Sequence, residues 1–457
     1  MVNPVVTSPR SIRWKTGAAV AIGNFMEWFD FAVYGFFAAS IGKLFFPNGN
    51  PAVSLLSSLA VFGVAFFMRP IGGLVLGSIA DRKGRRWSLT VTVLMMGVTT
   101  TLVGALPTFG QVGVLAPVLL VIIRCLQGFS AGGEWTGSSA FLVEMVPTDR
   151  RGLFGSIISA TAALATIAGG LIALGLTSWL SDAQLLSWGW RLPFLLAAPI
   201  ALVGLYVRLR LAETPVFESI RAHREVESKP VRAGTKRDFR AILLSFFFAS
   251  VQGLGFYYLA TYVVTYLGET VHLKQATALL LTAIGLALYA LLCPLAGLAA
   301  DRFGRRPVNI LGSAGLALFV FPAFLLMSTG NSAAVVFGFF VFAVFQSMVS
   351  VTTVVLLTEL FPAATRGSSS AIGFNLGLAI VGGPGPFVAE AIAEASSNKA
   401  MPAIYMVGIA VIGFVIVLRW LPETRGRDLR STRGALGERT PAAPASSWLN
   451  RQSTEYR

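Results

Sequence analysis

The chain has 457 residues, of which 55% are hydrophobic and 12% charged, and its mean hydropathy is +0.71. Soluble domains carry roughly 25% charged residues, so this composition excludes a soluble enzyme and a secreted disulfide scaffold. The net charge of +15 would suit a nucleic-acid binder, but its placement along the chain, described below, excludes that class as well. We expect an all-α integral membrane protein.

Apolar blocks of about 20 residues, the length of a bilayer-spanning helix, predict twelve transmembrane helices in two six-helix bundles. The first bundle is expected over residues 17–208, from blocks at about 17–42, 52–79, 88–107, 113–140, 153–179 and 190–208. The second is expected over residues 241–421, from blocks at about 241–267, 276–299, 308–328, 333–358, 367–393 and 402–420. Polar residues predict an N-terminal tail (1–16), a linker (209–240) and a C-terminal tail (422–457) that is disordered after about residue 425.

The basic residues predict the orientation of the chain. Thirty of the 36 Lys and Arg residues lie in the two tails, in the 208–240 segment and in the connections that share their side of the membrane. Because cytoplasmic loops carry an excess of Lys and Arg, we expect both termini and the linker to be cytoplasmic, in the cell inner (plasma) membrane. Topology therefore explains the positive charge, and no nucleic acid is expected as a partner.

Three motifs recur in the same order in the two halves. Gly77–Arg86 recurs as Gly297–Arg306, with the pattern Gly-x-x-x-Asp-Arg-x-Gly-Arg-Arg. The Glu144, Pro147, Arg151 pattern recurs at 359–366, and Ala212-Glu213-Thr214 is echoed at 422–424. Repeats at nearly constant offset predict two similar bundles related by an axis along the membrane normal.

The repeated Asp-Arg-x-Gly-Arg-Arg loop resembles the signature of the major facilitator superfamily. Four further segments are similar to the metabolite:proton symporter family: 23–31 (GNFMEWFDF), 67–73 (FMRPIGG), 127–137 (QGFSAGGEWTG) and 188–194 (WGWRLPF). Within that family the chain is most similar to the proline/betaine transporters, in 132–137 and 401–405. It departs from them in two ways: residues 426–457 contain no heptad repeat, and Arg124 stands where the proline/betaine members have a different basic residue and the dicarboxylate members have arginine.

Charges within the expected spans mark a functional path, because an ionisable side chain in a bilayer costs several kcal/mol. Glu27 and Asp30 share one face of the first helix. On the fourth helix, Arg124, Gln127 and Glu134 fall on one polar stripe, which lipid cannot satisfy. We predict that Glu27, Asp30 or Glu134 carries a proton. A pairing of Arg124 with Glu27 or Asp30 across helices is part of this hypothesis.

Arg124 or Arg69 is expected to hold a substrate carboxylate, because the planar guanidinium matches a carboxylate with two hydrogen bonds. Alternatively these charges only lock helices together. A cage formed by Trp28 and other aromatic residues would suit a quaternary ammonium, although such rings in membrane helices commonly pack or lie at interfaces. We expect these groups around a water-accessible hollow. The rings of this cage are Trp28, Tyr34, Trp135, Tyr257, Tyr258 and Tyr262. Besides Arg124 and Arg69, the substrate-binding candidates are Tyr34, Gln127, Trp135, Tyr257, Tyr258, Gln346 and Asn375.

The repeated loops are expected to form a conformational latch between the bundles, in which an acid pairs with an arginine or caps a helix end. The gating candidates are Asp81, Arg85, Arg86, Glu144, Arg151, Asp301, Arg305, Arg306, Glu359 and Arg366.

The resemblance implies a proton-coupled symporter that imports a small zwitterionic or carboxylate solute, such as proline or glycine betaine, by alternating access. A symporter of a di- or tricarboxylate or related organic acid (2-oxoglutarate, citrate or shikimate) is the second interpretation, because two deep arginines suit extra negative charge. A proton-driven drug exporter is third. No enzyme is expected, and neither is a metal or cofactor, the proton being the coupling ion. The expected partners are a small-molecule substrate, protons and the lipid bilayer, with no obligate protein partner.

Overall fold

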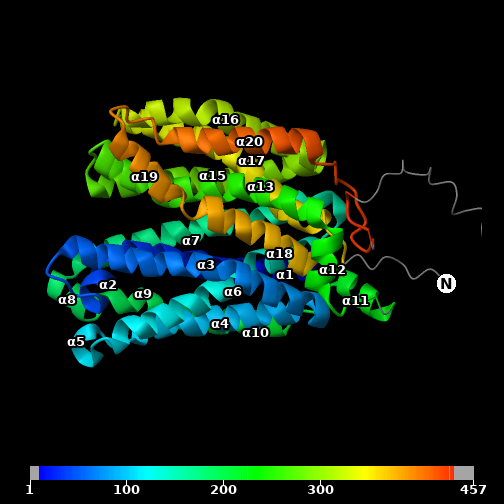
Figure 1. Cartoon of the computed structure of the whole chain (residues 1–457), viewed down its shortest axis with the longest axis horizontal. Coiled ribbons are helices and arrows are strands. Elements are labelled where there is room, and N and C mark those ends of the chain that lie inside the picture. Colours follow the sequence, from blue (N-terminus) through cyan, green and yellow to red (C-terminus); the bar gives the residue numbers. More distant parts are fainter. Residues whose placement is uncertain (1–9, 224, 432, 437–457) are drawn as a thin grey trace, which may run out of the picture.

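The computed structural model describes residues 10–223, 225–431 and 433–436, and within these ranges it contains helices and no strands. The outer parts of both expected tails, residues 1–9 and 437–457, lie outside the described residues. Long helices run side by side along the longest axis of the molecule, with the first half of the chain (blue to cyan) below and most of the second half (yellow to red) above in Figure 1. The protein is an all-α membrane protein of the twelve-helix type.

The helices of the first half correspond to the six expected spans, several of them longer than predicted and some interrupted. They are α1 (Arg10–Phe36), α2 (Ala38–Phe45), α3 (Pro51–Lys83), α4 (Arg85–Ala105), α5 (Phe109–Val112), α6 (Leu115–Met145), η1 (Thr148–Arg150), α7 (Arg151–Trp179), α8 (Asp182–Ser187), η2 (Gly189–Arg191), α9 (Leu192–Leu195) and α10 (Ala197–Leu209).

The linker contains two short helices, α11 (Pro215–Ala222) and α12 (Pro230–Arg237). Proline at the first position of each suits a helix start, because its missing N–H would have no partner there. The helices of the second half are α13 (Phe239–Tyr257), η3 (Tyr258–Tyr262), α14 (Val263–Thr265), η4 (Tyr266–Thr270), α15 (Gln275–Phe303), α16 (Arg305–Ser328), α17 (Ser332–Glu359), α18 (Arg366–Gly377), η5 (Leu378–Gly382), α19 (Gly385–Ala395) and α20 (Ala403–Trp420).

Eleven helical segments among the described residues are long and apolar enough to cross a membrane. The segment formed by α1 and α2 is not among them, although it occupies the place of the first span in the bundle. Asn24, Glu27 and Asp30 lower the hydropathy of α1, and all three are buried inside the protein rather than exposed to lipid. The first span is thus less apolar than the other eleven because it carries polar residues that face the protein interior.

The two halves meet mainly along two helix pairs, α3 with α18 and α7 with α15. At the first contact Gly77 faces Gly367 so closely that a Cβ on either would overlap the backbone of the other. The tight turns after α3 and α15 also need glycine, because Gly84 and Gly304 have φ values of 110° and 106°. These requirements account for both glycines of the repeated motif.

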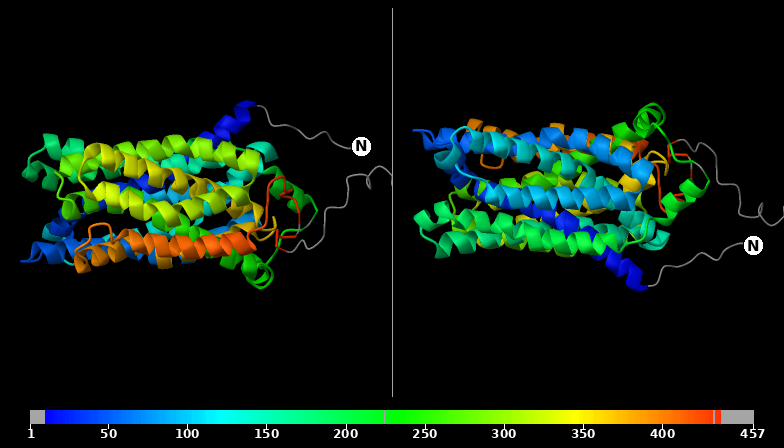
Figure 2. Two further views of the ribbon diagram at one scale, coloured as in Figure 1. Left: turned by 90° about the horizontal axis from the view of Figure 1, so that it is seen from above. Right: turned by 90° about the horizontal axis from the view of Figure 1, so that it is seen from below.

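One end of the molecule carries α11, α12 and the described segment after α20, as both views of Figure 2 show; we call it the linker end. The expectation of disorder after about residue 425 is wrong for the described part of the tail. Arg427 donates to the carbonyl of Glu359 at 2.8 Å, and the N–H of Ala435 donates to the carbonyl of Leu360 at 3.1 Å. Leu429 is buried. Composition alone missed these contacts because they are made to distant helices.

Candidate functional site

Four charged side chains of α1, α3 and α6 lie fully buried in the first half of the chain: Glu27, Asp30, Arg69 and Arg124. Each carboxylate pairs with an arginine from another helix, and the two pairs share α1. The sequence left open whether Arg124 pairs with Glu27 or Asp30. In the structure it pairs with Asp30, and Glu27 pairs with Arg69.

Asp30 and Arg124 belong to a hydrogen-bonded network. Arg124 Nη1 donates to Asp30 Oδ2 at 2.8 Å and to Gln127 Oε1 at 2.7 Å. Gln127 Nε2 in turn donates to Asp30 Oδ1 at 2.6 Å and to the hydroxyl of Thr100 at 3.0 Å. The guanidinium lies over the ring of Tyr34, 4.1 Å from its centroid. Both oxygens of Asp30 are therefore satisfied.

Glu27 and Arg69 form a more isolated pair. Arg69 Nη1 lies 2.8 Å from Glu27 Oε1. Among the described residues no hydrogen bond reaches Glu27 Oε2 or the Nε and Nη2 atoms of Arg69. The pair thus keeps unused hydrogen-bonding capacity in a fully buried position.

Glu134 lies in a third network, with Arg208 of α10. Arg208 Nη2 donates to Glu134 Oε1 at 2.5 Å and Nη1 donates to Oε2 at 3.2 Å. The hydroxyls of Ser138 and Thr92 also donate to this carboxylate. Four donors therefore surround this carboxylate.

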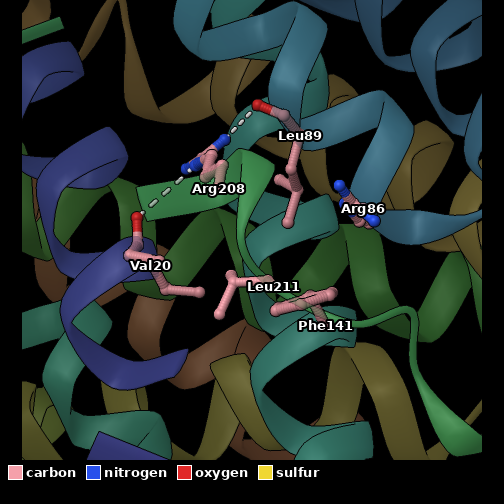
Figure 3. A pocket seen from close by; sticks show the side chains of 7 residues that line it. Val20, Arg86, Leu89, Phe141, Arg208 and Leu211 are labelled. Atoms are coloured by element: carbon pink, nitrogen blue, oxygen red, sulfur yellow. Dashed lines mark hydrogen bonds between the residues drawn. The ribbon is translucent and has the colours of Figure 1, made fainter. Parts of the chain in front are cut away.

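Arg208 was counted among the basic residues of the cytoplasmic connection, and that interpretation is wrong, because its side chain is buried inside the first bundle. Figure 3 shows it between α1 and α4, bonded to the carbonyl of Leu89 and beside Val20. The unpaired Glu134 of the predicted stripe was the signal that could have prompted a search for this partner.

The structure brings together only part of the predicted aromatic cage. The ring centroids of Trp28 and Trp135 are 6.1 Å apart, and those of Trp28 and Tyr257 are 5.7 Å apart. Phe256, which sequence reasoning missed, lies 4.6 Å from Trp28. These rings come from both halves of the chain and line the seam between them.

The other predicted rings lie elsewhere. Tyr34 stacks on Arg124, while Tyr258 and Tyr262 pack against one another with centroids 5.1 Å apart. The hydroxyl of Tyr258 donates to the carbonyl of Pro402 at 2.9 Å, inside the second bundle. A cage that includes all six rings is therefore wrong, because Tyr34 packs on Arg124 while Tyr258 and Tyr262 pack inside the second bundle.

Polar residues of the second half approach the same seam. Asn375 on α18 donates to the carbonyl of Gly132 on α6 at 2.8 Å, across the two halves. Gln346 on α17 donates to the carbonyl of Gln252 at 2.8 Å. Among the described residues, the side-chain oxygens of Asn375, Gln346 and Gln252 accept no hydrogen bond.

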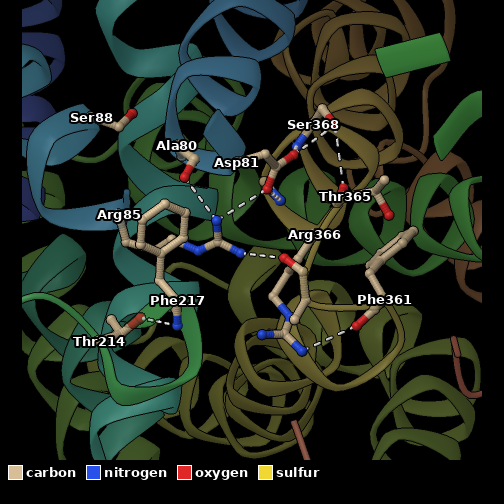
Figure 4. Close-up of polar contacts among 12 residues, drawn as sticks. Ala80, Asp81, Arg85, Ser88, Thr214, Phe217, Phe361, Thr365, Arg366 and Ser368 are labelled. Carbon is tan, nitrogen blue, oxygen red and sulfur yellow. Dashed lines mark hydrogen bonds and ion pairs between the residues drawn. The ribbon is translucent and has the colours of Figure 1, made fainter. Parts of the chain in front are cut away.

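Asp81 connects the two halves at the linker end. Its carboxylate accepts hydrogen bonds from the backbone N–H groups of Gly367 and Ser368, both at 2.8 Å, at the start of α18 (Figure 4). Arg85 pairs with Asp81 at 3.2 Å and donates to the carbonyl of Ala363 at 2.6 Å. The carboxylate also complements the positive end of the α18 dipole.

Asp301, in the second half of the chain, makes the equivalent contacts with a helix of the first half. It accepts hydrogen bonds from the N–H groups of Gly152 and Leu153 at the start of α7, both at 2.8 Å. Arg305 pairs with Asp301 at 3.1 Å. Each half of the chain therefore caps a helix of the other half.

Two buried glutamates complete the contact between the halves. Glu144 pairs with Arg366 of the second half at 2.5 Å and with Arg85 at 3.5 Å. Glu359 pairs with Arg151 of the first half at 3.1 Å and with Arg305 at 3.2 Å. Seven of the ten gating candidates thus contact the other half at the linker end, and Arg305 joins them through Asp301 and Glu359.

Arg86 and Arg306 do not take part in this contact. Arg86 donates to the carbonyl of Leu209 at 2.6 Å, and Arg306 donates to that of Leu418 at 3.0 Å. Each arginine therefore ties helices within its own bundle. The prediction that Arg86 and Arg306 join the two bundles is therefore wrong.

Sequence reasoning noticed the repeated Glu-Thr pairs but gave them no role. Glu213 accepts hydrogen bonds from the N–H groups of Arg85 and Arg86, which start α4. Glu423 does the same for Arg305 and Arg306 at the start of α16. Burial raises the pKa of Glu213, and its hydrogen bonds with backbone N–H groups and the charge of Arg85 oppose that shift.

The expected water-accessible hollow is not seen around the buried charges. A cavity of about 10 Å³, roughly the space of one water, lies beside Arg208. A second, apolar groove lies between α7 and α15. Glu27, Asp30, Arg69 and Arg124 line neither of them, and their side chains are closed off from solvent.

Comparison with known proteins identifies the family. The sequence model of the Major Facilitator Superfamily matches residues 20–386 and 245–453 of this chain. The proline/betaine transporter of Escherichia coli (strain K12) is 34% identical over 438 residues, which cover 94% of this chain and 86% of that protein. The glycine betaine/proline/ectoine/pipecolic acid transporter OusA of Dickeya dadantii (strain 3937) is 34% identical, over 94% of this chain and 87% of that protein.

Solved structures share the fold. The proton:xylose symporter XylE bound to 6-bromo-6-deoxy-D-glucose overlaps with a TM-score of 0.77 at 21% identity, over 94% of this chain and 99% of that chain. The inward open conformation of XylE from E. coli overlaps with a lower TM-score of 0.62 at 20% identity, over 91% and 98% of the two chains. The chain is therefore a multi-pass membrane transporter that belongs to the Major Facilitator Superfamily, in the family of the proline/betaine transporters.

Proposed function

We propose that this transporter is a proton-coupled symporter that imports a small zwitterionic or carboxylate solute, of the proline or glycine betaine kind, by alternating access. The observation that carries the proposal is the pair of buried carboxylate–guanidinium contacts that meet on α1, Glu27 with Arg69 and Asp30 with Arg124. The names of the relatives support the choice of solute.

Asp30 is the proton carrier in this proposal. Its charge is held by Arg124 and Gln127, so a change at either partner alters how readily it takes up a proton. A carboxylate that loses the arginine becomes a buried unpaired charge, which protonation removes. A movement of Arg124 away from Asp30 during the transport cycle would therefore be coupled to proton uptake.

Alternating access is supported by the state of the linker end. Asp81, Asp301, Glu144 and Glu359 hold the two halves together there with buried contacts. Opening this end requires all of them to break. We further infer that the linker end faces the cytoplasm, because most of the basic residues lie on that side.

A di- or tricarboxylate is the second candidate. It is favoured by Arg124, whose Nε and Nη2 atoms have no hydrogen-bond partner among the described residues and could bind a further carboxylate. A drug exporter is less well supported, because an apolar cation would not need buried guanidinium groups.

The test is uptake into proteoliposomes under an imposed pH gradient, with labelled proline, glycine betaine and 2-oxoglutarate in parallel. We expect accumulation of a zwitterion that an uncoupler abolishes. Accumulation of 2-oxoglutarate alone would establish the second candidate. No accumulation of any of the three, from protein that remains folded, would contradict the proposal.

A further inference from the structure

The three buried acid–arginine pairs of the first half differ in how completely their hydrogen bonds are satisfied. Glu134 receives four donors, and both oxygens of Asp30 accept hydrogen bonds. The unused nitrogens of Arg124 belong to a guanidinium covered by rings, with the centroid of Tyr34 at 4.1 Å and that of Phe62 at 5.4 Å. By contrast, the pair of Glu27 and Arg69 has one ion-pair contact and no further hydrogen bond among the described residues, and Arg69 lies over a single ring, that of Phe31, at 5.8 Å.

Further unsatisfied polar atoms lie near this pair. The indole N–H groups of Trp28 and Trp135 have no hydrogen-bond partner among the described residues. Trp28, which follows Glu27 on α1, contacts Trp135 and Phe256, and Phe256 contacts Tyr289 with centroids 5.6 Å apart. The rings that carry these indole groups therefore lie against each other on the seam between the halves.

The presence of several unsatisfied buried polar groups in one region of the protein requires a physical explanation. In folded proteins about 90% or more of buried polar groups have a hydrogen-bond partner. An unsatisfied buried group is destabilising, and more so when it is charged. A group of them on the surface that separates during transport indicates that a ligand satisfies them in another step of the cycle.

We propose that Glu27, Arg69 and the rings of Trp28, Phe256 and Tyr257 form the recognition site for a zwitterion with a methylated ammonium group. The inference rests on the proposed transport function and assigns its substrate class. Arg69 binds the carboxylate of the solute, while Glu27 and the rings bind the cationic nitrogen. Arg69 lies over the ring of Phe31, 5.8 Å from its centroid, and Phe31 contacts Trp28, whose ring contacts Tyr257, so the rings and the ion pair are adjacent.

Charge balance explains why a zwitterion fits. A zwitterion inserted into the pair gives each partner an opposite charge, and the net charge of the buried site stays zero. A second carboxylate next to Glu27 would instead add an uncompensated buried charge, which is strongly unfavourable. A methylated ammonium group also needs few acceptors, because aromatic faces attract it directly.

The assignment leaves the proton to Asp30. In this assignment a cationic nitrogen bound beside Glu27 favours the ionised form of that carboxylate while solute is bound. The two pairs on α1 therefore have different tasks, one for the solute and one for the coupling ion.

The test compares glycine betaine with 3,3-dimethylbutyrate, an isostere in which carbon replaces the cationic nitrogen. Binding is measured by titration calorimetry on the purified full-length protein in lipid nanodiscs. We expect the wild type to prefer betaine by about 10-fold or more, as expected for a desolvated cation–π contact together with a charge pair. In Glu27→Gln this preference for betaine should fall about 10-fold, because the neutral amide no longer attracts the positively charged nitrogen.

The matched control is another acid–arginine pair of the same bundle, Glu134 with Arg208. The double variant Glu27→Gln with Arg69→Gln should lose betaine binding, whereas Glu134→Gln with Arg208→Gln should keep the wild-type preference. Trp28→Phe should retain most of the affinity, and Trp28→Leu should lose about 2- to 30-fold. Thermal unfolding of each variant verifies that the protein is folded.

The outcomes separate this inference from the proposed function. Equal affinity of the wild type for both isosteres, or an unchanged preference in Glu27→Gln, would overturn the recognition site while leaving proton-coupled transport intact. The same holds if Asp30→Asn, and not Glu27→Gln, abolishes the preference. Failure of the wild type to bind or transport any zwitterion would refute the substrate proposed above as well.

Discussion

At the scale of single residues, the first bundle places three carboxylates against three arginines in a region that water does not reach in this state. Buried pairs of this kind contribute little net stability, because desolvation offsets most of their attraction. Removing one partner is costly, since it leaves the other charge alone. The number of other hydrogen-bond donors to each carboxylate therefore distinguishes the pairs. A carboxylate with many donors keeps its partner, and one with few donors can exchange its arginine for a ligand.

Asp30→Asn tests the coupling assignment. The amide cannot take up a proton, so accumulation driven by a pH gradient should fall to equilibration, while exchange of solute across the membrane should continue. A gradient of one pH unit supplies about 1.4 kcal/mol per proton, so the wild type should accumulate solute up to about 10-fold with one proton. Uptake and counterflow in the same proteoliposomes measure both activities.

The control is Asp149→Asn, because Asp149 is exposed and pairs only weakly with Arg150 at 3.8 Å. It should leave accumulation and exchange unchanged. Full pH-driven accumulation by Asp30→Asn would show that another acid carries the proton.

Arg208→Gln should destabilise the first bundle, because Glu134 is left as a buried unpaired charge. The expected loss is about 3–5 kcal/mol in the free energy of unfolding. The double variant Glu134→Gln with Arg208→Gln should recover most of it, since no charge remains buried. Denaturation in detergent measures this; a double variant as unstable as the single one would rule out the charge as the cause.

At the scale of elements, the latch depends on helix starts. The backbone N–H groups at the start of a helix carry partial positive charge and have no partner within the helix. Asp81 and Asp301 satisfy these groups on α18 and α7, each across the boundary between the halves. Glycine at the crossing allows the close approach that brings each carboxylate within reach. The repeated motif is thus a device for joining two bundles reversibly.

Asp81→Asn should lower the maximum transport rate more than the apparent affinity for solute. The neutral amide weakens the interaction with the α18 start by about 0.3–2 kcal/mol, which shifts the balance between closed and open states by about 2- to 30-fold. Initial-rate kinetics in vesicles give KM and the maximum rate separately. We expect KM to stay within about twofold.

A matched control for this variant is Arg82→Gln, an exposed neighbour in the same loop, which should change neither parameter. If Asp81→Asn instead raised KM strongly at an unchanged maximum rate, Asp81 would have to act on the solute site rather than on the latch.

At the scale of the whole molecule, the segment after α20 closes over the linker end. The carbonyl of Arg427 accepts a hydrogen bond from Arg151 of the first half at 2.8 Å. The carbonyl of Leu429 accepts one from Arg366 of the second half at 3.0 Å. The Leu429 side chain packs in one cluster with Val143 of α6 and Phe217 of α11. The segment therefore touches both bundles and the linker at once.

Leu429→Ala should favour opening of the linker end, because these contacts exist together only when the halves are closed. A buried leucine replaced by alanine typically loses about 2–5 kcal/mol. Electron paramagnetic resonance distances between labels at Trp87 and Phe303, both exposed at the linker end, should show a larger population of long distances. Leu311→Ala, at a leucine exposed on α16, is the control and should leave the distances unchanged. An unchanged distribution in Leu429→Ala would mean that the segment does not stabilise closure.

The sequence alone determined which residues enter the membrane, the division into two related sets of helices and the placement of charge on α1, α3 and α6. Hydropathy and repeats are local along the chain, so they can be read without knowing how the helices pack. Only the tertiary structure decided which acid meets which arginine. Arg208 looked like a loop residue, and Arg86 looked like part of the latch, because their partners come from other helices.

The same limit applies to the seam. Trp28 and Phe256 are far apart in sequence and on different halves, so no periodicity links them, yet their rings are 4.6 Å apart. The tail after residue 425 read as polar and unstructured, but its carbonyl groups bind arginines of both halves. Composition determines whether a segment can enter a bilayer; the partners of a buried charge depend on how helices approach one another, and that is a property of the folded molecule.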